Sequence, residues 1–96
     1  MLTIAIDFDE TITRDAELWR QFIDIAKSAG HRVICVTCRR NTMDNREFIK
    51  GYCESHFINV PIYFTDLNSK IEHMRARDIH VDIWIDDDPN CIIHGK

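Results

Sequence analysis

The sequence predicts an α/β fold built on an open, mainly parallel sheet, and three kinds of observation point to it. Short apolar runs suited to buried strands alternate with stretches of helical apolar spacing along the 96 residues. The resulting order, strand–helix repeated and closed by a strand, is typical of a doubly wound sheet. The strand-like runs are apolar at nearly every position, which favours strands covered by helices on both faces. We therefore expect a three-layer, doubly wound sheet of four or five strands.

Each element is placed by its own pattern, and together they give a Rossmann-like single domain over residues 1–96. The strands are predicted at 2–7, 32–37, 62–64 and 81–85, with a brief fifth strand at 91–94. Helices are predicted from Asp15 to about Gly30, over 43–56 and from Ser69 onward. Thr13 or Asp15 can cap the first helix, and Ser69 opens a capping box. The second helix is expected to turn inward the side chains of Phe48, Ile49, Tyr52 and Cys53.

Composition excludes several classes of protein. An apolar share of 45% suits a globular core, and a net charge of -4 argues against a general affinity for nucleic acid or anionic membranes. No stretch reaches the ~20 apolar residues of a membrane span, and the first residues lack a basic leader.

The four cysteines are expected to be reduced and the protein cytoplasmic. Cys35 and Cys38 have a C-x-x-C spacing, but Cys35 lies inside a strand, so redox or zinc chemistry is not expected. The five histidines are assigned to the surface.

Polar side chains stand where the predicted strands end. They are Asp7 and Asp9 after the first strand, Thr37 and then Arg39 and Arg40 after the second, Lys70 at the start of the third helix, and Asp86 and Asp87 after the last strand. The carboxyl ends of parallel strands share one edge, where ligands bind. Two carboxylates ~5 Å apart repel by roughly 3 kcal/mol at an effective dielectric of ~20. A divalent cation with oxygen ligands offsets such repulsion.

These residue types suit phosphoryl transfer. A carboxylate such as Asp7 can attack phosphorus. A second carboxylate, Asp9, can protonate the leaving oxygen and later activate water. Asp7 and Asp86 could supply ligands to Mg²⁺. The hydroxyl of Thr37 and the ammonium of Lys70 could hold the phosphoryl oxygens.

The sequence resembles the haloacid dehalogenase (HAD) superfamily of phosphohydrolases. The resemblance is carried by four motifs in the family's order: Asp7-Phe8-Asp9-Glu10-Thr11, the strand ending in Thr37, Lys70, and Ile83-Trp84-Ile85-Asp86-Asp87. It implies that Asp7 is the nucleophile and Asp9 the general acid/base. It implies Mg²⁺ bound by Asp7, the backbone carbonyl of Asp9 and Asp86, with Asp87 contacting the metal directly or through water. Thr37 and Lys70 would bind the substrate phosphate, and Arg39 is a further candidate for that role.

Many members of this superfamily carry a cap domain, for which the stretches 12–36 and 38–69 leave no room. We therefore expect an open site that accepts a phosphorylated small molecule or the end of a macromolecule. The sequence ends soon after Asp86, which would leave a sheet edge unprotected and favours a homodimer. The roles of Arg14 and Arg40 stay open.

The leading hypothesis is a Mg²⁺-dependent phosphomonoester hydrolase that forms an aspartyl-phosphate at Asp7. One alternative is a catalytically silent module on the same fold that binds a metal or phosphate; Asp9 argues against it, because a binder needs no acid/base. Another is a receiver-like signalling domain. Its phosphoacceptor would follow the third strand, where Asp66 is the candidate, but Thr37 and Lys70 come too early in the chain for it.

Overall fold

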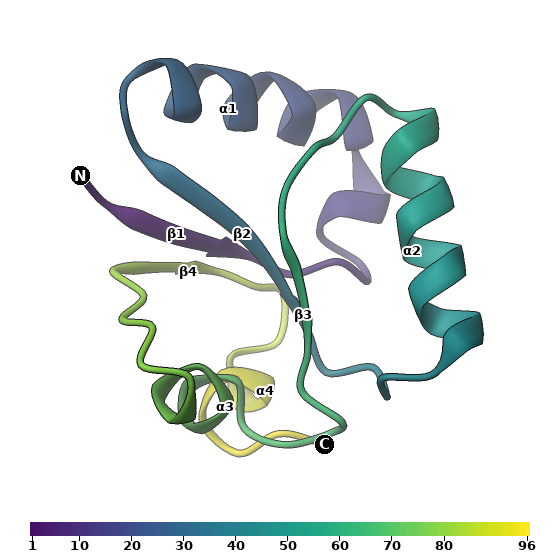
Figure 1. Cartoon of the computed structure of the whole chain (residues 1–96), viewed down its shortest axis with the longest axis vertical. Helices are drawn as coiled ribbons and strands as arrows, with labels where there is room; N and C mark the ends of the chain where they lie inside the picture. Colours follow the sequence, from purple (N-terminus) through teal and green to yellow (C-terminus); the bar gives the residue numbers. More distant parts are fainter.

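The computed structural model describes residues 1–96 and has an α/β architecture (Figure 1). The elements in chain order are β1 (Thr3–Ile6), the 3₁₀ turn η1 (Ile12–Arg14), α1 (Ala16–Ser28), β2 (Arg32–Thr37), α2 (Met43–Ser55), β3 (Ile62–Phe64), α3 (Lys70–Ala76), β4 (Ile83–Ile85) and α4 (Pro89–Ile93). The strands form one sheet of four strands in the order β3-β2-β1-β4. All three strand pairs are parallel, which confirms the predicted parallel sheet.

The register of the sheet aligns the carboxyl ends of its strands. Ile6 of β1 lies opposite Cys35 of β2 and Ile85 of β4. Thr37, the last residue of β2, lies opposite Phe64 of β3. The polar residues that follow β1, β2 and β4 therefore leave the sheet at one edge.

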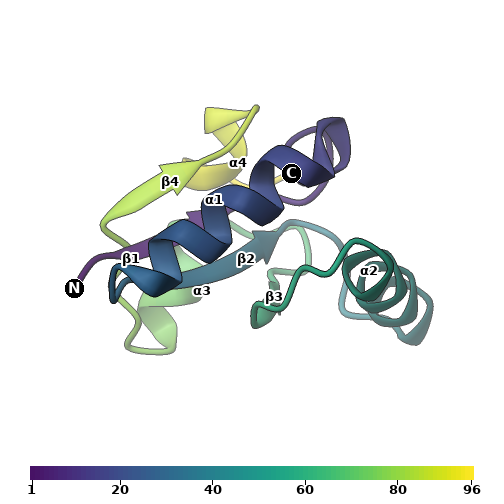
Figure 2. The same ribbon diagram turned by 90° about the horizontal axis from the view of Figure 1, so that it is seen from above.

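The core consists of two hydrophobic clusters, and alternate residues of the central strands enter different ones. Ile4, Ile6, Val33 and Cys35 pack with residues of α1 and α2, whereas Ala5, Ile34 and Val36 pack with Met74 of α3. Figure 2 shows α1 lying across the central strands. Each fully buried aliphatic side chain contributes roughly 1.5–3 kcal/mol. Burial of alternate residues in two clusters explains why β1 and β2 are apolar at nearly every position.

Side chains cap the helices at the predicted positions. Asp15, rather than Thr13, caps α1, and its carboxylate accepts from the Leu18 N–H at 3.1 Å. Ser69 caps α3 by accepting from the Glu72 N–H at 3.3 Å. Because α3 begins directly after this cap, Lys70 is its first residue.

Three expectations were wrong. The segment predicted as a fifth strand is the helix α4, whose cap Asp88 accepts from the Asn90 N–H at 3.1 Å. An Asp-Pro start fixes a helical first turn, and that local signal outweighs the β-propensity of the isoleucines that follow. Phe48 is 54% exposed rather than turned inward. Of the histidines assigned to the surface, His31 and His73 are half-buried.

All four cysteines are free, as predicted.

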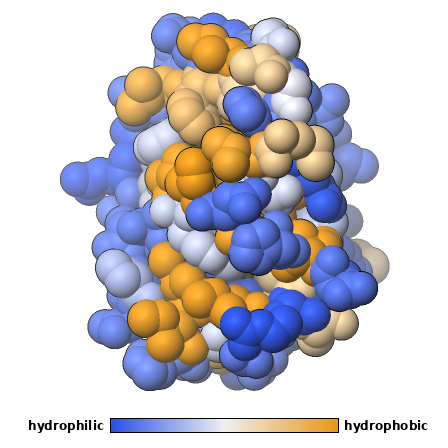
Figure 3. Space-filling view, turned by 90° about the vertical axis from the view of Figure 1, so that its left-hand side faces the viewer, coloured by the Kyte–Doolittle hydropathy of each residue, from blue (hydrophilic) through white to orange (hydrophobic).

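The remaining surface is mixed in polarity. Several large apolar side chains are exposed, among them Leu18, Ile25 and Ile83. Figure 3 shows apolar areas separated by hydrophilic ones on one face of the molecule. The longest helices, α1 and α2, have 13 residues each, so no helix here could cross a lipid bilayer.

Candidate functional site

A polar cleft of about 170 Å³ opens where the strands end. Its lining includes every residue proposed from the sequence for catalysis, metal binding or phosphate binding: Asp7, Asp9, Thr37, Arg39, Lys70, Asp86 and Asp87. A larger groove of about 320 Å³ lies beside α3 and β4, but it is mostly apolar and holds none of these residues. The chemistry of the side chains, rather than the size of the cavity, makes the smaller cleft the candidate site.

The ammonium group of Lys70 lies buried between two carboxylates that line this cleft. Its Nζ donates to Asp7 Oδ1 at 2.7 Å and to Asp86 Oδ2 at 2.5 Å. The side chains of Lys70 and Asp86 are 1% and 2% exposed, so the contacts are shielded from water. A buried charge is tolerated only when it is paired and hydrogen-bonded. The pairing of Lys70 therefore joins three segments of the chain, the ends of β1 and β4 and the start of α3.

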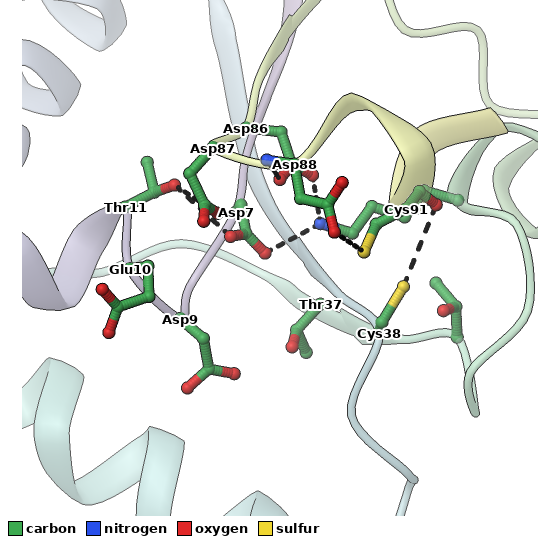
Figure 4. A network of polar contacts seen from close by, with 12 residues as sticks. Asp7, Asp9, Glu10, Thr11, Thr37, Cys38, Asp86, Asp87, Asp88 and Cys91 are labelled. Carbon is green, nitrogen blue, oxygen red and sulfur yellow. Dashed lines mark hydrogen bonds and ion pairs between the residues drawn. The ribbon is translucent and has the colours of Figure 1, made fainter. Parts of the chain in front are cut away.

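A third carboxylate completes a group that could hold a metal ion. Oxygen atoms of Asp7, Asp86 and Asp87 all lie within 4.8 Å of one another, and Figure 4 shows these side chains close together. Three carboxylates against the one ammonium of Lys70 leave a formal charge of -2 here. Mg²⁺ binds oxygen ligands at about 2.0–2.1 Å, which places ligands of one shell roughly 3–4 Å apart. The oxygen donors and their net negative charge are therefore of the kind that a hard divalent cation prefers.

Thr11 supports this group, and the sequence analysis gave it no role of its own. Its hydroxyl lies 3.3 Å from Asp7 Oδ2 and 3.4 Å from Asp87 Oδ1, and can donate to either oxygen. The chain after β1 turns back in a single helical turn, in which the Ile12 N–H donates to the Asp7 carbonyl at 3.3 Å. The spacing of four residues between Asp7 and Thr11 is the signal that could have placed them on one side of that turn.

Burial sets the ionisation of the central pair. Burial raises the pKa of Asp7 to about 7, against the lowering effect of Lys70, and the carboxylates of Asp87 and Asp86 add to the rise. Burial acts to lower the pKa of Lys70, but its hydrogen bonds to Asp7 and Asp86 outweigh this and raise it. Asp7 is thus a carboxylate whose charge is poorly stabilised without a further cation.

Asp9 and Arg39 form a separate pair at the mouth of the cleft. The side chain of Asp9 points away from Asp7, Asp86 and Asp87 (Figure 4). Its two oxygens accept from Arg39 Nε and Nη2, each at 2.8 Å. Phe8, between Asp7 and Asp9, is fully buried and anchors this turn in the core. In this structure the guanidinium of Arg39, predicted to bind phosphate, is held instead by the carboxylate of Asp9.

The other candidate residues divide between the cleft and the open surface. The hydroxyl of Thr37 is buried at the cleft and accepts from the Arg39 N–H at 3.3 Å. Arg14 is exposed and pairs with Glu10 at 3.3 Å. Arg40 is exposed and forms no ion pair. Asp66 does not line the cleft, and its carboxylate accepts from the Asn41 N–H at 2.6 Å. A receiver-like phosphoacceptor at Asp66 would therefore stand apart from Lys70.

Comparisons of the chain with protein-family models, with curated proteins and with solved structures found no match.

Proposed function

We propose that this protein is a Mg²⁺-dependent phosphomonoester hydrolase that works through an aspartyl-phosphate at Asp7. The proposal includes a capless, doubly wound three-layer domain, in line with the resemblance to the HAD superfamily. The observation that carries it is the buried ammonium of Lys70 between Asp7 and Asp86, in a cleft that also holds Asp9 and Thr37. Stability alone gives no reason for this arrangement, because apolar side chains of similar volume stabilise a core as well or better.

The cleft offers donors for a phosphate next to Asp7. The hydroxyl of Thr37 and the ammonium of Lys70 are the groups that would hold the phosphoryl oxygens. Asp7, Asp86 and Asp87 would hold the metal ion, with the backbone carbonyl of Asp9 as the ligand that the family resemblance implies. When bound, Mg²⁺ would neutralise charge on the phosphoryl oxygens.

The reaction then follows from the two carboxylates. An oxygen of Asp7 attacks phosphorus as the bond to the leaving oxygen breaks, and protonated Asp9 gives its proton to that oxygen. Asp9, now a carboxylate, takes a proton from a water molecule that attacks the phosphorus. The bond between Asp7 and phosphorus breaks, inorganic phosphate leaves, and Asp9 is protonated again. The sum is one ester and one water converted to one alcohol and one phosphate.

A set of variants assayed on a panel of phosphomonoesters tests this proposal. Asp7→Asn should lower the rate in Mg²⁺ at least 10³-fold, because it removes the nucleophile. Asp9→Asn should lower it about 10²–10⁴-fold, the range of general acid–base catalysis. Asp44→Asn is the matched control, since Asp44 lies exposed in the first turn of α2 and does not line the cleft. Full activity of Asp7→Asn, or a wild-type protein that hydrolyses no member of the panel, would show that the proposal is wrong.

One observation favours a second candidate, the catalytically silent binding module. Both oxygens of Asp9 accept hydrogen bonds from Arg39, so the acid/base is engaged elsewhere. A silent module would bind Mg²⁺ and be stabilised by it, yet turn over no phosphomonoester. Stable labelling of the protein by acetyl phosphate without turnover would instead favour a signalling role.

A further inference from the structure

We infer that Arg39 forms a subsite for a second anionic group of the substrate, a carboxylate or phosphate carried by the leaving group. This inference rests on the proposed function, and it names the class of substrate: phosphomonoesters whose alcohol bears another oxyanion. The bidentate contact of Arg39 with Asp9 supplies the geometry. A guanidinium fork that holds a carboxylate at 2.8 Å through Nε and Nη2 fits a ligand oxyanion equally well.

The guanidinium is held in place without the help of Asp9. Its third nitrogen, Nη1, donates to Asn45 Oδ1 at 3.1 Å. Its carbon Cζ lies 5.5 Å from the ring centre of Phe8 and 5.0 Å from that of Phe48. The two rings stand nearly perpendicular, at 89°, so they form a corner in which the guanidinium sits. The cation–π contact with Arg39 also explains why the apolar ring of Phe48 lies half-exposed at the rim of the cleft.

Asp9, by contrast, can leave at little cost. The side chains of Arg39 and Asp9 are 29% and 42% exposed, so water reaches the ion pair. Water can hydrate the Asp9 carboxylate once it has moved, and an anion that takes its place restores the two hydrogen bonds to Arg39. The exchange therefore leaves neither charge buried and unpaired. The fork stays where it is, and it keeps both donors directed at the position that Asp9 has left.

The exchange connects recognition to catalysis. Asp9 is the residue that must reach the leaving oxygen, and it cannot do so while both of its oxygens are bound to Arg39. A leaving group whose own oxyanion occupies Arg39 releases both oxygens of Asp9 from the guanidinium, so that this side chain can turn toward the leaving oxygen. A leaving group without an oxyanion leaves Asp9 paired with Arg39. Three basic side chains line the cleft: Arg39, Lys70 and Lys96. Lys70 is already shared by two carboxylates, so Arg39 is the guanidinium available to the second oxyanion of the substrate.

Matched substrates test the inference. We compare kcat/KM in Mg²⁺ for 3-phosphooxypropanoate, 1,3-propanediol bisphosphate and the neutral analogue 3-hydroxypropyl phosphate. One charge-assisted contact predicts that the wild type prefers at least one of the anionic substrates about 10- to 100-fold over the neutral one. The carboxylate and bisphosphate arms tell which oxyanion the subsite takes. In Arg39→Gln the ratio of anionic to neutral substrate should fall to about one.

Two further variants keep the test decisive. Arg39→Lys retains the charge without the planar fork and should keep only part of the preference, and it serves if Arg39→Gln fails to fold. Arg40→Gln, the exposed neighbour without an ion pair, should leave the ratio unchanged. A wild-type ratio near one, or a preference that survives both substitutions of Arg39, overturns the inference while hydrolysis itself stands. A wild type that hydrolyses other members of the phosphomonoester panel but none of these three compounds overturns this inference alone, whereas one that hydrolyses no phosphomonoester overturns the proposed function as well.

Discussion

Lys70 occupies an unusual position for a lysine, because its charge is buried in the fold rather than solvated. The ammonium has two carboxylate partners, Asp7 and Asp86, and a third carboxylate, Asp87, lies close by. Its long side chain is 1% exposed. The energetic cost of removing Lys70 is therefore set less by the lost contacts than by the carboxylates left behind.

We predict that Lys70→Met destabilises the metal-free protein by about 3–5 kcal/mol, the range for a buried pair that loses one partner. Urea unfolding in EDTA measures the loss. Mg²⁺ should restore more stability to this variant than to the wild type, because no ammonium competes for the carboxylates. Lys50→Met, on the exposed side of α2, is the control and should change stability by less than about 0.5 kcal/mol. A loss below 1 kcal/mol for Lys70→Met would contradict the assigned role.

Asp7 gives the metal-free protein a specific dependence on pH. Its pKa is raised from 3.8 to about 7 in the fold, so the folded state holds this proton more tightly than the unfolded state. The stabilising contribution is complete below pH 3.8 and is lost as the pH rises toward about 7. The slope of one such group is at most about 1.4 kcal/mol per pH unit.

The measurement is the difference in unfolding free energy between the wild type and Asp7→Asn, taken in EDTA from pH 4.5 to pH 7.5. The wild type should lose stability relative to the variant as the pH rises. Saturating Mg²⁺ should abolish the trend, since a bound cation favours the carboxylate. Parallel curves for the two proteins in EDTA would rule out a raised pKa at Asp7.

At the scale of elements, the N-terminal cap of α3 determines where Lys70 stands. Ser69 accepts from the Glu72 N–H, and its own hydroxyl donates to the carbonyl of Ile92 in α4 at 3.0 Å. One side chain thus starts α3 and ties it to the helix that follows Asp86 and Asp87. Loss of this side chain should affect the cleft as well as stability.

We predict that Ser69→Ala costs about 1 kcal/mol, as loss of a cap does elsewhere, and that it also lowers kcat/KM toward phosphomonoesters. Asp15→Ala is the matched control, because Asp15 caps α1 in the same way by accepting from the Leu18 N–H at 3.1 Å and does not line the cleft. Both variants should lose similar stability in urea, but Ser69→Ala should lose more activity. Equal activity losses would mean that the cap contributes stability alone.

The elements also show what a sequence can and cannot predict. β1, β2 and their helices were predicted because their apolar periodicity reflects burial on one or two faces, a local property. The placement of Asp7, Lys70 and Asp86 at one edge followed from the parallel order of the strands. The segment after Asp88 was taken for a strand because Ile92 and Ile93 favour one, although the cap signal of Asp88 and Pro89 was present in the sequence.

The pairing of side chains across the cleft could not be predicted from the sequence. The pairing of Asp9 with Arg39 joins residues 30 positions apart, and it depends on which rotamer each side chain adopts. The sequence does not tell whether the guanidinium of Arg39 is free to bind phosphate or is paired with Asp9. The exposure of Phe48 has the same origin, since its ring contacts Phe8 and Arg39 at the rim of the cleft instead of the core.

At the scale of the whole molecule, the charge of the cleft works against the fold when no cation is present. The carboxylates of Asp7, Asp86 and Asp87 come from the ends of β1 and β4, so their repulsion acts on the pairing of these strands. β4 has only three residues and lies at the edge of the sheet, with β1 as its one partner. Stability of this edge should therefore depend on what lies between the carboxylates.

We predict that Mg²⁺ stabilises the whole molecule through this site. At a concentration 100 times its Kd, a ligand that binds only the folded state adds about 2.7 kcal/mol, which corresponds to a rise in Tm of roughly 10–20 °C for a domain of this size. Thermal melting with Mg²⁺ and with EDTA measures the rise. Asp86→Asn should remove most of it and Asp87→Asn part of it, because Asp87 is the more exposed ligand. Asp44→Asn should keep the rise in full. If the wild type melts at the same temperature in Mg²⁺ and in EDTA, the metal site is wrong, and the buried Lys70 alone would have to offset the carboxylates.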